Sequence, residues 1–275
     1  MKFKDYLYLS ERIYSSQGKV TITAQTDKGG SSKEEISTYL PVHGIPHVSV
    51  GKMTHGVPVY SAFNAVAAGA DGETTLLLKA LKGIGPYSTN DKQVGWLLSA
   101  TAKWLKTFLT KEKIDVILYP KSSSSFLHDF VDQLKKEYPS IIVVDNAFSK
   151  REVKSIDDEI DDFINKEDPD YEKIGAKNQD QLKKSIKRII AKNIEDGKGA
   201  TLDAKKLFKG HAKFVQNFMQ FAAKDDKSII DKHVLIVDDI LSSGSTFVDM
   251  ARQLKSHAPS KISGFVLFKV VSTAK

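Results

Sequence analysis

Short runs of apolar residues recur along the chain from residue 114 onward, and the runs at residues 114–119 and 234–237 each lead into a polar loop and then into apolar residues at helical spacing. The runs at residues 114–119, 141–144, 234–237 and 262–271 are rich in β-branched side chains and have the length of strands buried on both faces. Apolar stripes at residues 94–109, 126–134 and 247–254 predict amphipathic helices between them. This alternation predicts an α/β fold, with a mainly parallel twisted sheet flanked by helices and joined by right-handed crossovers.

The N-terminal part of the chain has a different pattern. Short β-like runs at residues 19–24, 38–41, 46–50 and 57–62 lie between glycines and prolines, which predicts a small antiparallel arrangement. Residues 65–84 fit either a strand or a short helix. We therefore expect an N-terminal β-rich hood or accessory module, residues 1–89, followed by a core of residues 90–275.

A change in composition marks a charged helical insertion in this core, at about residues 155–232. Its first part is acidic and its second part is basic. Residues 182–190 have the apolar spacing of one amphipathic helix, and residues 207–221 suggest a helical pair interrupted near Gly210. Residues 155–177 show almost no apolar periodicity, so we expect residues 150–177 to form a mobile lid that orders only over a bound ligand.

Two adjacent carboxylates, Asp238 and Asp239, end the apolar run at residues 234–237. Because neighbouring carboxylates repel and are costly to bury, we expect both to face a crevice, where hydroxyl groups or a cation satisfy them. A loop of small residues then opens the next predicted helix, and it consists of Ser242, Ser243, Gly244, Ser245 and Thr246. Backbone N–H groups and the helix dipole at such a position bind phosphate.

Residues 234–246 resemble the phosphoribosyl diphosphate (PRPP) signature of type I phosphoribosyltransferases, in which four apolar residues, two acids, two apolar residues and a Ser-Ser-Gly-Ser-Thr loop follow one another. The resemblance covers about residues 90–154 and 230–275. It implies that Asp238 and Asp239 hold the ribose hydroxyls, directly or through Mg²⁺ and water, and that the loop holds the 5-phosphate. The 6-oxopurine enzymes of this family carry an aspartate where this chain has Ser242, so hypoxanthine or guanine is not the expected acceptor.

The same resemblance gives roles to two other polar stretches. Lys121, Ser122 and Ser123 follow the first core strand, where the family binds diphosphate, although serines before a helix are also ordinary caps. The cations Lys150, Arg151 and Lys154 follow the next strand and resemble the start of a catalytic loop, although an ordinary charged loop fits equally well. Cations here would stabilise the charge that develops on the leaving diphosphate.

Composition excludes several kinds of site and favours an anionic partner. The 275 residues include no cysteine, which excludes disulfides, thiolate zinc sites and a cysteine nucleophile, and the net charge of +7 suits an anionic partner. No apolar run approaches the ~18 residues that a membrane-spanning helix needs, and no signal peptide is evident. We therefore expect a cytoplasmic protein with no membrane anchor.

The resemblance implies a Mg²⁺-dependent enzyme that transfers a 5-phosphoribosyl group from PRPP to a nitrogen acceptor, a nucleobase or related amine, and releases diphosphate. The alternative is a non-catalytic regulator that senses PRPP or nucleotides and binds nucleic acid. A diphosphokinase that makes PRPP ranks lower, because no nucleotide-binding segment is evident. A homodimer is left open, and the N-terminal module and the insertion are expected to select the acceptor.

Overall fold

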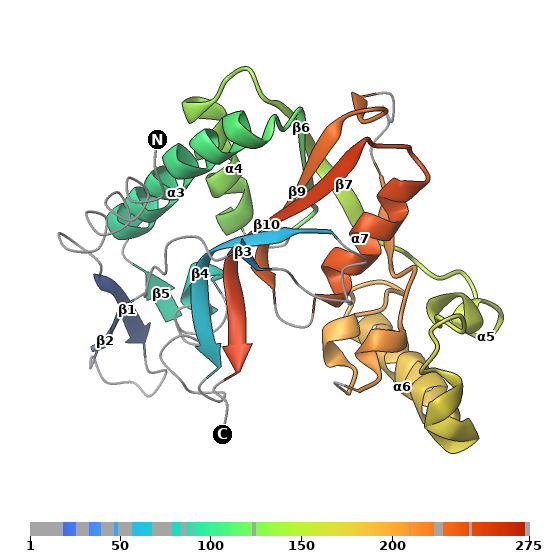
Figure 1. The fold of residues 1–275 in the computed structure, drawn as a ribbon. Coiled ribbons are helices and arrows are strands. Elements are labelled where there is room, and N and C mark those ends of the chain that lie inside the picture. Colours follow the sequence, from blue (N-terminus) through green and yellow to red (C-terminus); the bar gives the residue numbers. More distant parts are fainter. Residues whose placement is uncertain are drawn as a thin grey trace.

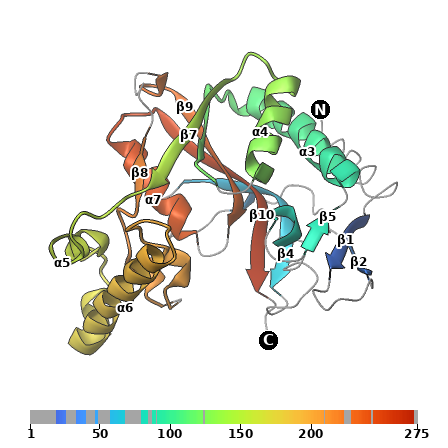
Figure 2. The same ribbon diagram turned by 180° about the vertical axis from the view of Figure 1, so that it is seen from behind.

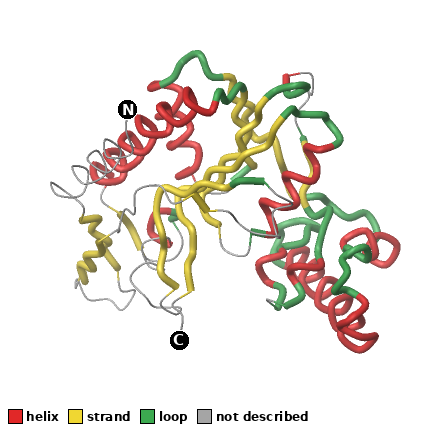
Figure 3. The backbone as a smooth tube through the Cα atoms, in the orientation of Figure 1, coloured by secondary structure: helices red, strands yellow, loops and turns green. Residues whose placement is uncertain are grey.

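The computed structural model describes residues 19–25, 33–39, 47–48, 57–67, 79–83, 87–89, 91–122, 125–208, 210–222, 228–241 and 244–272. A seven-stranded sheet forms the centre of the molecule. Helices α3 (Asp91–Glu112) and α4 (Ser125–Glu137) cover one face, and helix α7 (Ser245–Lys255) covers the other together with the insertion (Figures 1 and 2). Figure 3 shows the strands of the central sheet between these helices, with a second, smaller group of strands beside them.

The central sheet has the order β3-β4-β10-β9-β6-β7-β8. Its strands are β3 (His47–Val48), β4 (Val59–Ala67), β6 (Val116–Pro120), β7 (Ile142–Lys150), β8 (Met219–Phe221), β9 (His233–Leu241) and β10 (Lys261–Ser272). The five inner strands run parallel to one another, and the two edge strands pair antiparallel. The α/β fold with a mainly parallel sheet is therefore confirmed, and β10 lies directly beside β9.

Each face of the sheet has its own core. On one face, the apolar stripes of α3 and α4 pack against the sheet, and the rings of Phe130 and Phe265 stack with centroids 5.9 Å apart. On the other face, Phe247, Met250 and Leu254 of α7 pack against β9 and β10, together with apolar residues of the insertion. The helical spacing read from these three segments is confirmed.

Two expectations about the strands are wrong. Residues 57–62 were expected in an antiparallel accessory module, but β4 lies in the central sheet, parallel to β10. A separate antiparallel sheet is formed by β1 (Lys19–Gln25), β2 (Lys33–Tyr39) and β5 (Tyr87–Thr89). Residues 141–144 were expected to form a fully buried strand, but Ile142 is 50% exposed and burial in β7 begins at Ala147. The first residues of β7 are exposed or only partly buried. Ala147 and Phe148, nearer its carboxyl end, are buried because they pack into the core that contains the apolar residues of the insertion.

The insertion is a folded unit. Its helices are α5 (Ile156–Glu159), η2 (Ile160–Phe163), η3 (Glu172–Ile174), α6 (Gly175–Glu195), η4 (Ala204–Lys206) and η5 (Ala212–Phe214). Helix α6 is confirmed, but residues 207–221 form 3-10 turns and the short strand β8, so the expected helical pair is wrong.

The expectation that residues 155–177 cannot bury apolar surface is also wrong. Ile160, Phe163, Ile164 and Tyr171 are all buried and pack into the core beneath α6. Their spacing is irregular because they lie in turns and 3-10 helices, so no single period reveals them. In addition, the described residues include no helix long and apolar enough to cross a bilayer.

Candidate functional site

The two aspartates of the signature lie inside β9 and not beyond its end. Val234 and Ile236 belong to the core beneath α7, whereas Leu235 and Val237 belong to the core beneath α3 and α4. Neighbouring strand residues point to opposite faces, so the two carboxylates that follow also lie on different faces. Both are buried, and the expectation that they end the strand is therefore wrong.

Asp239 is paired with a lysine that the sequence pattern did not single out. The Nζ atom of Lys82 lies 2.6 Å from Oδ2 of Asp239. Lys82 belongs to a helical turn closed by backbone hydrogen bonds from Lys82 N–H to the Lys79 carbonyl and from Gly83 N–H to the Ala80 carbonyl. This turn falls in the stretch that the sequence left unassigned, and a lone lysine there carries no signal of its partner.

Asp238 makes one of its contacts with the backbone of its own strand. Its Oδ1 accepts a hydrogen bond from the backbone N–H of Asp239 at 2.8 Å. This contact orients one carboxylate oxygen along β9 and leaves the second to other partners. The two adjacent acids therefore have different surroundings, one held by a cation and one held by the backbone.

The loop after β9 leads into α7 through Gly244, which has φ 78° and is the N-cap of the helix. This φ lies in the left-handed region, which favours glycine. Ser245 and Thr246 form the first turn of α7 and are partly exposed, whereas Ser242 and Ser243 lie outside the described residues. The first turn of α7 holds no acidic residue, so its N–H groups suit an anion.

Helix α7 is fixed to the sheet by a glycine. A Cβ atom at Gly264 of β10 would lie 2.1 Å from Cζ of Phe247, a separation that packed side chains do not tolerate. The absence of a side chain at Gly264 lets the Phe247 ring rest directly on the strand. The N-terminus of α7 is thereby held at a defined height above the carboxyl end of β9.

Helix α7 is also joined to the insertion, through the buried Asp249. Its carboxylate accepts the backbone N–H of Asn217 at 2.7 Å and that of Met219 at 2.8 Å, and Arg252 lies 3.2 Å away. Burial raises the pKa of Asp249, although the hydrogen bonds oppose this shift. The sequence pattern missed Asp249, because an aspartate within an amphipathic helix normally faces solvent.

The loop after β6 lies beside the signature loop, because β6 and β9 are neighbouring parallel strands and their carboxyl ends share one edge of the sheet. Lys121 is exposed, and its backbone N–H donates to the Phe148 carbonyl at 2.7 Å. Ser122 is partly exposed, and Ser123 lies outside the described residues. The fold thus brings together two of the loops that the sequence singled out.

The third stretch, at the end of β7, is engaged with the insertion. Arg151 Nη2 lies 2.6 Å from Glu159 Oε2 and 2.9 Å from Asp162 Oδ2, and its guanidinium carbon lies 5.3 Å from the centre of the Phe163 ring. Burial lowers the pKa of Arg151, but the hydrogen bonds that its guanidinium donates to Asp162 and Glu159 outweigh this effect, so the net shift of the pKa is upward. Arg151 therefore stabilises the acidic part of the insertion.

Its two neighbours have other environments. Lys150 Nζ lies 3.8 Å from Asp203 Oδ2, at the limit of an ion pair. Lys154 is exposed, and among the described residues its ammonium group makes no ion pair, although its backbone N–H donates to Glu159. Of the three cations, Lys154 is the one whose ammonium group forms no ion pair with the described part of the insertion.

The donor set suits Mg²⁺ only in part. The described residues contain no group of three or more His, Cys, Asp or Glu side chains placed to hold a metal. Mg²⁺ is commonly bound through one or two carboxylates together with substrate phosphates and water, and Asp238 and Asp239 offer one carboxylate on each face of β9. The fit therefore depends on a phosphorylated ligand that completes the coordination.

Known proteins are similar to parts of this chain. A solved structure of hypoxanthine-guanine phosphoribosyl transferase from L. donovani shares 15% sequence identity with a TM-score of 0.34, covering 64% of this chain and 67% of that one. No curated protein sequence matches the chain. The family model described as "Phosphoribosyl transferase domain" matches residues 185–275, which include β9, both aspartates and α7. Residues 185–275 are therefore similar to a phosphoribosyl transferase domain, and the match extends over this part of the chain alone.

Proposed function

We propose that this chain transfers the 5-phosphoribosyl group of PRPP to a nitrogen acceptor, a nucleobase or a related amine, and releases diphosphate in a Mg²⁺-dependent reaction. The observation that carries the proposal is the unit formed by β9, its two aspartates and the glycine-capped α7, which lies within the matched domain. In this unit an anion-binding helix N-terminus stands next to carboxylates that suit sugar hydroxyls.

Each part of the edge has a role in this proposal. The backbone N–H groups at the start of α7, with Ser242, Ser243, Ser245 and Thr246, bind the 5-phosphate. Asp238 and Asp239 hold the ribose hydroxyls and, with the diphosphate, the Mg²⁺ ion, which neutralises negative charge when bound. Lys121, Ser122 and Ser123 contact the diphosphate from the end of β6.

The reaction breaks the bond between the anomeric carbon and the diphosphate oxygen, and forms a bond between that carbon and the acceptor nitrogen, whose proton is lost to solvent. Negative charge grows on the departing diphosphate, and a nearby cation lowers the energy of that state. Lys154 is the preferred cation for this role, followed by Lys150. Arg151 must break its ion pairs with Glu159 and Asp162 before it can contact the diphosphate, so it is the least favoured of the three cations.

The second candidate is a regulator that binds PRPP without turnover and also binds nucleic acid. The net charge of +7 and the exposed basic residues of α6 favour it. The two candidates differ in chemistry, so one assay separates them.

The test is diphosphate release from PRPP and Mg²⁺ with a panel of nucleobases and amines. A transferase releases diphosphate with at least one acceptor, and Asp238→Asn with Asp239→Asn abolishes release while the far-ultraviolet circular dichroism is retained. Asp231→Asn is the matched control, because Asp231 is exposed before the amino end of β9, at φ 57°, which asparagine tolerates. Saturable PRPP binding without release favours the regulator, and the absence of both overturns the proposal.

A further inference from the structure

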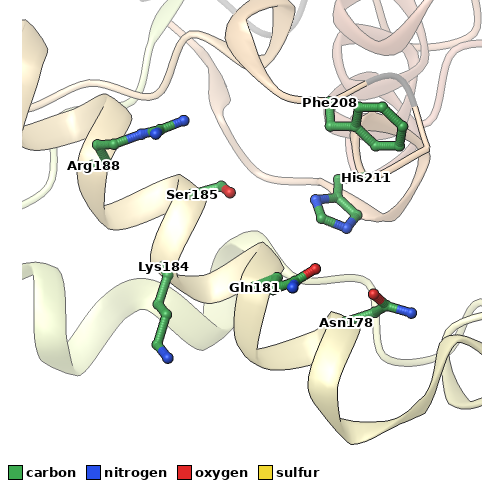
Figure 4. Close-up of a pocket in the computed structure, with 7 residues that line it drawn as sticks. All are labelled: Asn178, Gln181, Lys184, Ser185, Arg188, Phe208 and His211. Atoms are coloured by element: carbon green, nitrogen blue, oxygen red, sulfur yellow. The ribbon is translucent and has the colours of Figure 1, made fainter.

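A cleft of about 510 Å³ opens on the insertion, between α6 and the segment at residues 208–211 (Figure 4). It is lined by Asn178, Gln181, Lys184, Ser185, Arg188, Phe208 and His211. None of these residues belongs to the strand, helix or loops of the proposed PRPP site. The cleft therefore needs its own explanation.

An exposed aromatic ring forms one wall. Phe208 is 73% exposed, the largest exposure among the large apolar side chains identified as exposed in the described part of the chain. Its ring meets the edge of His211, with centroids 5.7 Å apart and an interplanar angle of 76°. His211 contacts one side of the Phe208 ring. The rest of the Phe208 ring surface can stack on a planar ligand.

The opposite wall carries positive charge that the described insertion does not neutralise. On α6, Lys183 pairs with Asp161 and Lys187 pairs with Asp157. Their sequence neighbours Lys184 and Arg188 make no ion pair with any described residue, and both line the cleft. The acidic part of the insertion thus neutralises one side of α6 and leaves the cations of the cleft side for an anion.

Polar groups between these walls also lack partners. The Nδ1 atom of His211 is buried and has no hydrogen-bond partner among the described residues, a state that costs free energy unless a ligand or water fills it. Figure 4 shows Gln181 and Ser185 on α6, on the helix side of the gap that faces Phe208 and His211. An amide and a hydroxyl in this position can hydrogen-bond to the edge of a flat heterocycle.

We propose that this cleft binds a nucleotide unit, with the base stacked on Phe208, its edge hydrogen-bonded by Gln181 or His211, and its phosphate held by Arg188. Aromatic stacking beside a cation is the usual way in which proteins bind single nucleotides within a strand. A free mononucleotide and a residue of single-stranded nucleic acid share this chemistry. The proposal is independent of the reaction at the signature loop.

The test is calorimetric titration of the full chain with the four ribonucleoside monophosphates, their nucleosides, inorganic phosphate, and six-residue single strands of RNA and DNA. Nucleoside monophosphates are also products of the proposed transfer, so each titration is repeated with excess PRPP and in a Gly244→Val variant. Binding at the cleft persists under both conditions. Binding that disappears in both belongs to the signature site and overturns the proposal.

Variants of the cleft give the second readout. Phe208→Ala and Arg188→Gln each weaken nucleotide binding by roughly tenfold or more, in the range expected for a lost stacking or phosphate contact. Lys187→Gln and Ile194→Ala are the matched controls. Lys187→Gln removes one positive charge from α6 and Ile194→Ala removes an exposed apolar side chain, both outside the cleft, so nucleotide binding should be unchanged. Tighter binding of the strands than of the mononucleotides assigns the site to nucleic acid, and the reverse assigns it to free nucleotides. No binding at millimolar concentrations, or binding insensitive to Phe208→Ala and Arg188→Gln, overturns the proposal.

Discussion

Lys82 and Asp239 form a close ion pair that ties the N-terminal part of the chain to the signature strand. The Nζ to Oδ2 distance is 2.6 Å, and the two side chains are 19% and 6% exposed. A carboxylate this deeply placed needs a compensating charge, which Lys82 supplies here. Any cation or sugar hydroxyl that binds Asp239 meets a site where a charge is already present.

We predict that this pair contributes measurable coupling. In a double-mutant cycle of Lys82→Met and Asp239→Leu, each single variant leaves one charged group without its partner, whereas the double variant leaves neither. The coupling free energy of unfolding should be about 0.5–3 kcal/mol in favour of the pair. Urea unfolding of the four proteins measures it, and additive single effects would show that the contact contributes nothing.

The contact between Gly264 and Phe247 predicts a sensitive position in the sheet. Gly264→Ala places a methyl group inside the volume of the Phe247 ring, so α7 must shift or the ring must leave its rotamer. We expect a loss of about 1–3 kcal/mol in the free energy of unfolding. Gly95→Ala is the control, because a Cβ there meets nothing within 4 Å and alanine favours a helix by about 1 kcal/mol. Equal effects of the two substitutions would contradict the packing.

Asp249 predicts a pH dependence of stability. Burial raises its pKa above the ordinary 3.8, so between that value and the raised pKa the unfolded chain has lost a proton that the folded chain retains. The contribution of Asp249 is full below the ordinary pKa and falls as the pH rises through the raised pKa. The stability of the wild type relative to Asp249→Asn should therefore decrease over this range and then level off. Denaturant unfolding from pH 3.5 to 8 measures it, and a constant difference would contradict the shift.

The folded insertion predicts slow exchange without ligand. Amides at and near Phe163 and Tyr171 should be protected in the free protein, because both rings are buried in a core shared with α6. Arg151→Gln should increase their exchange by removing the ion pairs to Glu159 and Asp162, whereas Lys173→Gln, which removes only an exposed pair with Asp170, should not. Hydrogen exchange read by mass spectrometry tests this, and fast exchange that slows only with PRPP would restore the mobile lid.

The left-handed backbone at Gly244 predicts a local defect in phosphate binding. Valine at φ 78° is strained, and we expect Gly244→Val to cost about 1–3 kcal/mol in stability and to reposition the first N–H groups of α7. Under the proposed function, PRPP affinity should fall further than this strain alone explains. Gly197→Val, at φ 69° with nothing within 4 Å of its Cβ, is the control for strain away from α7 and from Asp239. Unchanged PRPP affinity in folded Gly244→Val would contradict a role for this turn.

Much of the fold follows from local pattern. The apolar runs at residues 114–119 and 234–237 predict buried strands because continuous β-branched runs suit the middle of a parallel sheet, and they overlap β6 and β9. Helices α3, α4, α6 and α7 follow from segments that each carry one apolar face. The signature could also be placed, since strand, acids, small loop and helix are consecutive. The small residues after the two acids predict a loop that opens a helix, and Gly244 is the N-cap of α7.

The sequence by itself therefore determined the α/β class, the position of the signature and the turn at Gly244, because these depend on residues close together in the chain. Only the tertiary structure decided that Lys82 pairs with Asp239, that Asp249 holds Asn217 and Met219, and that Arg151 serves the insertion. Tertiary packing likewise determines the structure of residues 155–177, because their apolar side chains pack against those of α6 and against Phe214. These contacts join residues far apart in the chain, and their free energy depends on burial and on partners that no local period encodes.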